Sequence, residues 1–262
     1  MKIKTRPNPP LFPEMSHEMK KLVEEAYQWF IRPLGSHLTD VCTDCCVSKQ
    51  DETLLIKTPV QELSEDLIYQ YLDAAYTDCR SNEIAHFLPR ILELLASHKH
   101  IRHSTEITLD KCHFEAPYWK PQQLDFIHRY SAQYLTDLLK TPPKQTHLPS
   151  ATEVIVMFSL SGIDVTHLFS VWEEMATKYP TAVAHFAQMM RYEVDDYSTF
   201  NNVFCDNPKF YQQINDWLNS SQTAAIFLPA IEHYYFENED LSEEESRHFS
   251  CLHSHLSKKV GK

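Results

Sequence analysis

The sequence predicts an all-α protein, built as a multi-helix bundle or an irregular array of helices. Apolar residues recur at intervals of three and four along most of the chain, which is the period of an amphipathic helix. Only 3 of the 262 residues are glycine, whereas parallel α/β folds use glycine at phosphate loops and strand ends. The 15 prolines fall mainly between the apolar stripes, where they end helices.

Two helical domains are predicted, because residues 141–150 contain three prolines and read as a linker. An N-terminal domain with a cysteine-rich loop covers 14–140, and an acidic C-terminal domain covers 151–257. Serines positioned as N-caps predict several helix starts, two of them within capping boxes. The predicted starts of this kind are Ser48, Ser64, Ser150 (with Glu153) and Ser242 (with Glu245).

Two stretches allow more than one prediction. Residues 99–120 contain Ile107 and Leu109, which alternate as in a short strand, but Ser104 is also placed to cap a helix. Pro89 lies within an apolar helical pattern and predicts either a kink or a new helix with this proline in its first turn.

The charge of the chain is negative and unevenly distributed. The formal net charge is −12, and residues 141–262 carry 16 acidic against 8 basic side chains. Such a surface repels nucleic acid and anionic membranes and attracts a basic partner. The N-terminus lacks the apolar region of a signal peptide, and seven cysteines without an export signal are expected to be reduced. We therefore expect a cytoplasmic protein that binds neither nucleic acid nor membrane.

The segment Cys42-Thr43-Asp44-Cys45-Cys46 is the strongest candidate for a chemical site. Cys42 and Cys45 have the Cys-x-x-Cys spacing of a zinc knuckle, Cys46 is a third ligand, and His37 is a candidate fourth. Other candidates to complete the set are Cys79, Cys112 and His113. The cofactor prediction is none or one structural zinc. Two alternatives stay open: redox chemistry, which normally uses this spacing in a thioredoxin-like βαβ unit, and three buried structural thiols.

Acidic residues that lie beside aromatic residues in the C-terminal half predict a surface that binds a basic protein. The candidate partner-binding residues are Tyr192, Glu193, Asp195, Asp196, Tyr197, Glu237, Glu239 and Asp240. Farther along, His248, Cys251 and His255 share a helical face; we expect a polar surface stripe there rather than a metal site.

The known catalytic sequence signatures are missing. The chain contains no glycine-rich phosphate loop, no Gly-x-Ser-x-Gly elbow, no His-Glu-x-x-His and no Asp-x-Asp calcium loop. A binding protein is therefore the first prediction and no catalytic residue is assigned. The alternatives are a cysteine- or metal-dependent hydrolase that uses residues 42–46, and a helical adaptor or scaffold.

Residues 30–130 resemble a group of uncharacterised bacterial helical proteins. The shared features are a cysteine-containing segment, a leucine-rich helix and a (Phe/Tyr)-Leu-Pro-Arg-x-Leu-Glu-Leu stretch. Here they are residues 42–46, Leu54-Leu55 and Phe87-Leu88-Pro89-Arg90-Ile91-Leu92-Glu93-Leu94. Proteins of this kind are similar to those encoded beside secreted bacterial toxins, where they act as immunity partners. The resemblance implies a binding role with a cognate toxin or effector, and it does not extend to residues 150–262.

Overall fold

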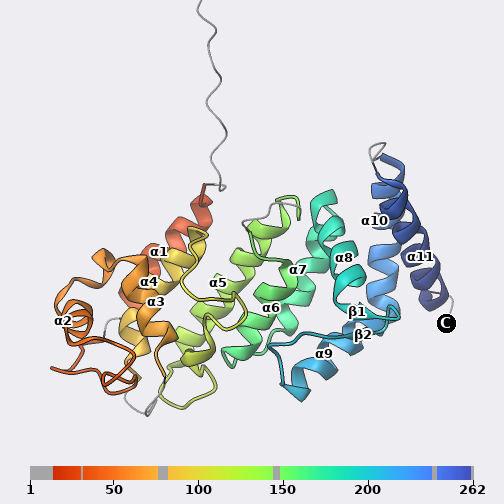
Figure 1. The fold of residues 1–262 in the computed structure, drawn as a ribbon. Helices are drawn as coiled ribbons and strands as arrows, with labels where there is room; N and C mark the ends of the chain where they lie inside the picture. Colours follow the sequence, from red (N-terminus) through yellow and green to blue (C-terminus); the bar gives the residue numbers. More distant parts are fainter. Residues whose placement is uncertain (1–13, 31, 76–81, 144–147, 238–240, 261–262) are drawn as a thin grey trace, which may run out of the picture.

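The computed structural model describes residues 14–30, 32–75, 82–143, 148–237 and 241–260 of the chain (Figure 1). Its regular structure is almost entirely helical, so the predicted all-α class is confirmed. The α-helices are α1 (His17–Trp29), α2 (Lys49–Lys57), α3 (Glu65–Asp73), α4 (Ile84–Ala96), α5 (Pro121–Leu139), α6 (Ala151–Leu160), α7 (Thr166–Ala176), α8 (Pro180–Tyr192), α9 (Pro208–Asn219), α10 (Ser221–Glu237) and α11 (Glu243–Val260). One short antiparallel pair joins β1 (Val194–Asp195) to β2 (Thr199–Phe200).

The predicted caps begin their helices as expected. The hydroxyl oxygens of Ser48 and Ser64 accept backbone N–H bonds in the first turns of α2 and α3. Ser150 begins α6 in a complete capping box, and Ser242 precedes α11 in a reciprocal arrangement with Glu245. These local hydrogen bonds satisfy helix donors that would otherwise lack a partner.

The ambiguous stretches resolve differently. Pro89 lies inside α4, which begins at Ile84, so the prediction of a new helix at this proline is wrong. In residues 99–120 the structure has neither the strand nor the longer helix, but only a 3₁₀ turn at Asp110–Cys112. The buried ammonium of Lys111 fixes this segment, because it donates to the carbonyl oxygens of Tyr71 and Ala74 at 3.0 and 2.5 Å. A long-range contact of this kind leaves no periodic trace in the sequence.

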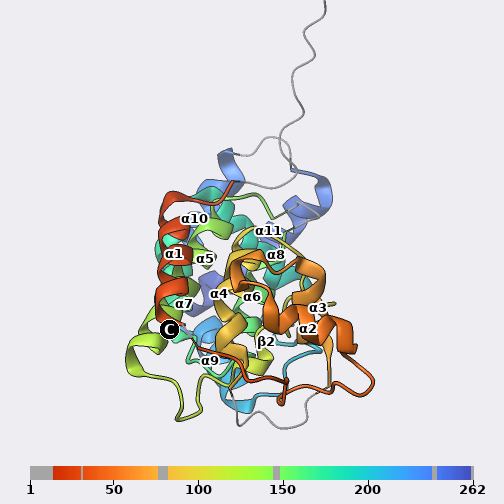
Figure 2. The ribbon, with the colours of Figure 1, turned by 90° about the vertical axis from the view of Figure 1, so that its left-hand side faces the viewer.

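The helices stand side by side in an elongated row that follows the chain order (Figure 1). Seen end-on, the N-terminal helices lie in front of the C-terminal ones (Figure 2). Helix α5 packs against α1, α6 and α7, and α10 packs against α7, α8 and α11. Contacts therefore run across the 141–150 segment, while the division of the chain into two domains stays a prediction.

The core of the C-terminal half is a cluster of stacked aromatic rings. Trp172 on α7 is fully buried, and its indole N–H donates to the carbonyl of Ala182 at 2.9 Å. The rings of Phe186 and Phe227 stack with centroids 3.8 Å apart, which ties α8 to α10. Because buried aromatic side chains dominate core energetics, this cluster holds the last helices in a fixed relation. Among the described helices, none is both long enough and apolar enough to cross a bilayer.

Candidate functional site

The turn of residues 42–46 is here called the thiol loop. The buried carboxylates of Asp40 and Glu83 fix the segment that leads into it. The Glu83 side chain, 6% exposed, accepts the backbone N–H groups of Thr39 and Asp40 at 2.6 and 2.9 Å. The Asp40 carboxylate accepts the backbone N–H of Glu83 at 2.8 Å in return. Carboxylates that accept backbone donors in a buried setting make strong, charge-assisted bonds. The chain that enters the loop is therefore held rigidly against the start of α4.

Backbone bonds and two valines hold the loop itself. The N–H of Cys42 donates to the carbonyl of Ala75 at 2.8 Å, and the N–H of Val47 donates back to the Cys42 carbonyl at 3.1 Å. Val41 and Val47 are 2% and 1% exposed, so each end of the loop is anchored in the core. The residues between them project outward as a closed turn.

The three loop cysteines come together as predicted. The Sγ atoms of Cys42 and Cys45 are 3.3 Å apart, and those of Cys45 and Cys46 are 3.6 Å apart. All three sulfurs lie within 4.8 Å of one another, and this is the only such group of potential metal ligands in the described residues. Sulfurs around tetrahedral zinc lie about 3.8 Å apart, given a Zn–S bond of about 2.3 Å. The two sulfur–sulfur distances of 3.3 and 3.6 Å are therefore slightly shorter than those around bound zinc.

The predicted further ligands do not join the loop. The imidazole of His37 is 79% exposed and its Nδ1 lies 3.7 Å from a carboxylate oxygen of Glu52, outside the sulfur cluster. Cys112 is fully buried in the core, and the His113 ring faces Glu115. The remaining candidate, Cys79, lies outside the described residues. The structure therefore corrects the ligand set to three sulfurs within the described part of the chain.

The loop makes its three thiols chemically unequal. Backbone N–H groups and the neighbouring S–H of Cys45 lower the pKa of Cys42 to about 7. The pKa of Cys45 rises to about 11, because its thiol donates toward the sulfur of Cys42 and loses that bond on ionising. A thiolate accordingly forms first on Cys42, and thiolates are the forms that bind metals and attack electrophiles. Cys45 and Cys46 are exposed, and Cys42 is half-buried, so this chemistry is accessible from solvent.

A groove opens at the opposite end of the row, between α8 and the α10–α11 pair. Its volume is about 270 Å³, and we call it the α8–α11 groove. Its lining residues are Pro142, Pro143, Ala184, Ala187, Gln188, Arg191, Tyr192, Tyr234, Leu241, Glu245, His248 and Phe249. The Oε1 atom of Gln188 is buried there and accepts no hydrogen bond from any described residue. A buried acceptor without a donor is costly, so the packing of α8 leaves hydrogen-bonding capacity unused beside the groove.

The predicted partner-binding residues divide between surface and interior. Tyr192 is 67% exposed at the mouth of the α8–α11 groove, with the Arg191 guanidinium 4.9 Å from its ring centre. Asp195, Asp196 and Glu237 are exposed as expected.

The others are placed differently. Tyr197 is half-buried because its ring stacks on those of His248 and His255. Glu193 is half-buried and accepts a hydrogen bond from the Thr152 hydroxyl, so this carboxylate is already engaged within the protein and its role in partner binding stays a prediction. Glu239 and Asp240 lie outside the described residues.

The histidine face of α11 is structural. His248 lies 2.9 Å through Nε2 from the carbonyl oxygen of Ala187, which joins α11 to α8. The donor atoms of His248, Cys251 and His255 do not form a metal-binding group among the described residues. His248 is partly buried, whereas a polar surface stripe was predicted on this face.

Three carboxylates lie close together near the start of α6. The sequence did not indicate this cluster. Glu106 is 5% exposed, and the charges of Glu106 and Glu153 both act on Glu193. Burial, together with these two like charges, raises the pKa of Glu193 to about 7. Because the three residues are distant in sequence, no local spacing signals the cluster.

Replacing Glu193 with glutamine should stabilise the protein above pH 7. An acid whose pKa is raised on folding holds a proton that the unfolded chain releases, so its contribution to stability falls as the pH rises from about 4.5 to 7. The variant should gain on the order of 1 to 3 kcal/mol at pH 8 and nearly nothing at pH 4. Urea unfolding of both proteins at each pH measures this difference. Histidines with lowered pKa, such as His185, contribute equally to both proteins and cancel. An equal effect at both pH values would contradict the assignment.

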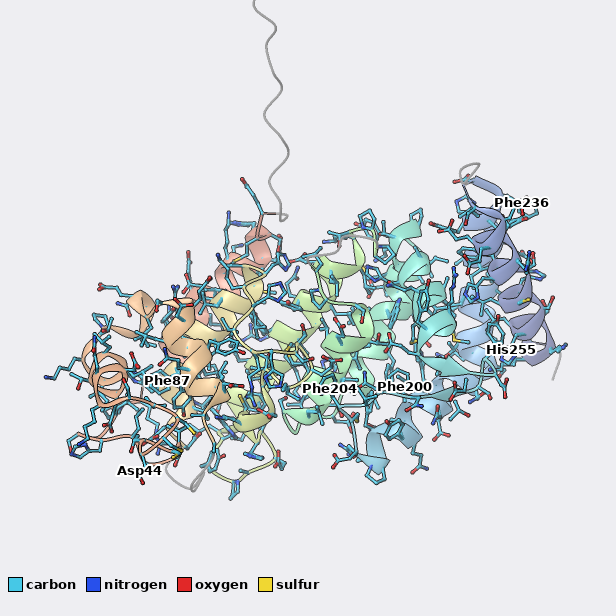
Figure 3. All side chains as sticks on the ribbon, in the orientation of Figure 1. Asp44, Phe87, Phe200, Phe204, Phe236 and His255 are labelled. Carbon is cyan, nitrogen blue, oxygen red and sulfur yellow. The ribbon has the colours of Figure 1, made fainter. Side chains whose placement is uncertain are left out.

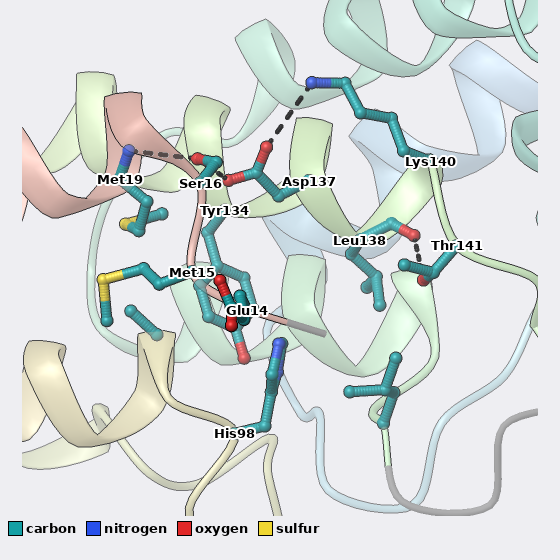
Figure 4. Close-up of a pocket in the computed structure, with 12 residues that line it drawn as sticks. Glu14, Met15, Ser16, Met19, His98, Tyr134, Asp137, Leu138, Lys140 and Thr141 are labelled. Carbon is teal, nitrogen blue, oxygen red and sulfur yellow. Dashed lines mark hydrogen bonds and ion pairs between the residues drawn. The ribbon is translucent and has the colours of Figure 1, made fainter. Parts of the chain in front are cut away.

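A further cavity, of about 240 Å³, lies between the start of α1 and the end of α5 (Figure 4). The Asp137 carboxylate is already used there, because it accepts from the Ser16 hydroxyl at 2.5 Å and lies 3.5 Å from the Lys140 ammonium. The polar groups of this cavity thus join α1 to α5, and we assign it a structural role.

Comparison with known proteins adds no further guide, because no family model, curated protein or solved structure matches the chain. Geometry and chemistry therefore carry the assignment of function.

Proposed function

We propose that the protein binds another protein in the bacterial cytoplasm, and that this partner is a toxin or effector domain with a basic surface. The observation that carries the proposal is the α8–α11 groove, which combines an apolar wall, an unpaired acceptor and a negatively charged surround. Binding through this groove would block the toxin, as an immunity protein does. An adaptor function with a different partner uses the same surface and is the alternative.

The α8–α11 groove and a neighbouring hollow supply the apolar anchors that protein interfaces use. Tyr192 is 67% and Phe236 is 79% exposed, although large aromatic side chains are usually buried. Phe249 lines the groove and also a second hollow of about 340 Å³ beside Phe236. Exposed aromatic residues next to hollows are typical of interface hot spots, where one partner inserts a side chain between those of the other.

The charge around the groove favours a basic partner. Glu243 and Glu244 are exposed in the first turn of α11, and Glu237 is exposed at the end of α10. Opposite charge accelerates encounter and suppresses wrong partners. A partner lysine or arginine can approach these exposed carboxylates from solvent.

Growth rescue tests this proposal directly. The gene beside that of this protein is expressed from an inducible promoter, alone or together with the full chain. If the neighbour is a toxin and the proposal is right, growth stops in the first case and continues in the second, and the two proteins purify as a complex. Arrest that the full chain does not relieve, with no complex formed, would count against an immunity function.

A structural zinc in the thiol loop is a second candidate property, favoured by the three sulfurs within 4.8 Å. We expect purified protein to contain about one equivalent of zinc by elemental analysis. The double variant Cys42→Ser with Cys45→Ser should lose the metal and melt at a lower temperature, because metal binding to the folded state adds to folding free energy. The matched control is Cys251→Ser, since Cys251 is an exposed cysteine on α11 and does not belong to the thiol loop. Purified wild-type protein that contains no zinc and melts at the same temperature as the double variant would contradict the zinc proposal. The cysteine-dependent hydrolase stays an untested alternative.

A further inference from the structure

In the thiol loop, the sulfur of the half-buried Cys42 and that of the exposed Cys45 lie close together without a disulfide between them. The sulfurs of Cys42 and Cys45 are 3.3 Å apart, and both residues are free cysteines. A disulfide bond is about 2.05 Å long, so closing it needs an approach of about 1.3 Å. We propose that Cys42 and Cys45 form a reversible oxidation site, which hydroperoxides convert to an intrachain disulfide.

The reaction proceeds in two balanced steps. The Cys42 thiolate attacks one oxygen of the hydroperoxide, the O–O bond breaks, and the leaving oxygen takes a proton to give water or an alcohol. The sulfur becomes a sulfenic acid, oxidised by two electrons. Cys45 then loses its proton and attacks this sulfur; the S–O bond breaks, water leaves and the S–S bond forms. Two thiols and one hydroperoxide thus give one disulfide and two molecules of water, or one of water and one of alcohol.

The loop structure favours this pair over the vicinal pair Cys45–Cys46. A bond between Cys45 and Cys46 would close a small ring through a single peptide bond and distort that bond from its planar trans form. Cys42 and Cys45 are separated by two residues of one turn, and their carrier segments are anchored at Val41 and Val47. Because the ends of the turn are held fixed, the second step is an encounter between preplaced groups and outpaces further oxidation of the sulfenic acid.

The inference stands independently of the proposed protein partner. Asp44 of the thiol loop and Phe236 beside the α8–α11 groove lie at opposite ends of the row (Figure 3). It also connects to the zinc proposal, since the same sulfurs cannot bind zinc and each other. Oxidation would expel a bound metal, and a bound metal would protect the thiols.

Intact mass and peptide mapping of the full chain test the site. The protein is freed of metal with a chelator and reduced. The reductant is then removed, and the protein is treated with hydrogen peroxide at about one equivalent. We expect a mass loss of about 2 Da, a linked Cys42–Cys45 peptide, and full reversal by a thiol reductant. The Cys46→Ser variant should react at a rate within about twofold of the wild type. Cys42→Ser and Cys45→Ser should each lose the 2-Da product. Circular dichroism checks that both variants remain folded.

Cys251 provides an internal reference for the oxidation rate in the same sample. Cys251 is exposed but unclustered, so it should oxidise more slowly and by addition of oxygen rather than by disulfide formation. A dominant linked peptide other than Cys42–Cys45, a gain of oxygen atoms at Cys42 without the disulfide, or equal oxidation of Cys42 and Cys251 would each overturn the proposal. Loss of the disulfide in the Cys46→Ser variant would overturn the choice of the pair.

Discussion

Replacing Glu83 with alanine should lower the free energy of unfolding by about 3 to 5 kcal/mol and open the thiol loop. The Glu83 carboxylate accepts two backbone N–H groups, from Thr39 and Asp40, and the Thr39 hydroxyl as well. All three hydrogen bonds to Glu83 are lost in the variant, and a hydrogen bond to a charged group contributes about 1.5 to 3 kcal/mol. The full cost applies to the buried N–H of Asp40, and a smaller cost applies to the two Thr39 donors, because Thr39 is exposed. This is the largest stability effect that we expect from a single polar side chain near the site.

The consequence for the loop can be measured separately from stability. Without Glu83 the entry to the loop is free to move, so Cys42 and Cys45 meet less often. At a temperature where the variant remains folded, peroxide-driven disulfide formation should slow at least about tenfold, because preplacement of reacting groups is lost. Urea unfolding and intact mass give the two readouts. Glu62→Ala, at an exposed position outside the thiol loop, is the control and should change neither. Normal stability and an unchanged rate in Glu83→Ala would show that the loop needs no buried support.

Reversing two charges at the start of α11 should reduce the rate of partner binding by about tenfold or more at low salt. Glu243 and Glu244 occupy the first turn of this helix beside the α8–α11 groove, and Glu244 pairs with Arg191. In the double variant Glu243→Lys with Glu244→Lys, a basic partner is repelled at a surface where the wild-type protein attracts it. The difference should shrink as salt rises, since screening acts over about 8 Å at physiological ionic strength.

The chain provides a closely matched control for this variant. Glu65 and Asp66 occupy the first turn of α3, which is also capped by a serine, and Glu65 pairs with Lys99. Glu65→Lys with Asp66→Lys changes the net charge by the same amount and perturbs a helix start in the same way. Surface plasmon resonance with the co-expressed partner should show nearly wild-type association for this control. Equal slowing in both variants would mean that overall charge, rather than the groove, directs the encounter.

Local patterns in the sequence were sufficient to predict the fold class and most helix starts. Ser64 and Ser150 illustrate why, because a cap and its helix are adjacent in the chain and interact by short-range hydrogen bonds. The thiol loop was equally predictable, since a Cys-x-x-Cys turn brings its sulfurs together by itself. Residues 99–120 were not predictable, because they are held by the Lys111 ammonium on distant carbonyl oxygens.

The candidate binding surface was located only in part. The run Tyr234-Tyr235-Phe236-Glu237 signals an aromatic and acidic helix end, yet the sequence does not show that it faces α8. Gln188 had no signal at all, because its unpaired oxygen arises from the packing of α8 against α11. Glu193 is less exposed than its acidic neighbours suggested, because it accepts a hydrogen bond from the hydroxyl of Thr152 at the start of α6.

Hydrogen–deuterium exchange of the full chain, with and without its co-expressed partner, tests the central claim most directly. Slowed exchange marks the backbone that the partner covers or stabilises. The account predicts protection at the end of α8, the end of α10 and the first turns of α11, with the thiol loop unchanged. Protection confined to residues 38–57 with none along the α8–α11 groove would contradict it and place the binding surface at the opposite end of the molecule.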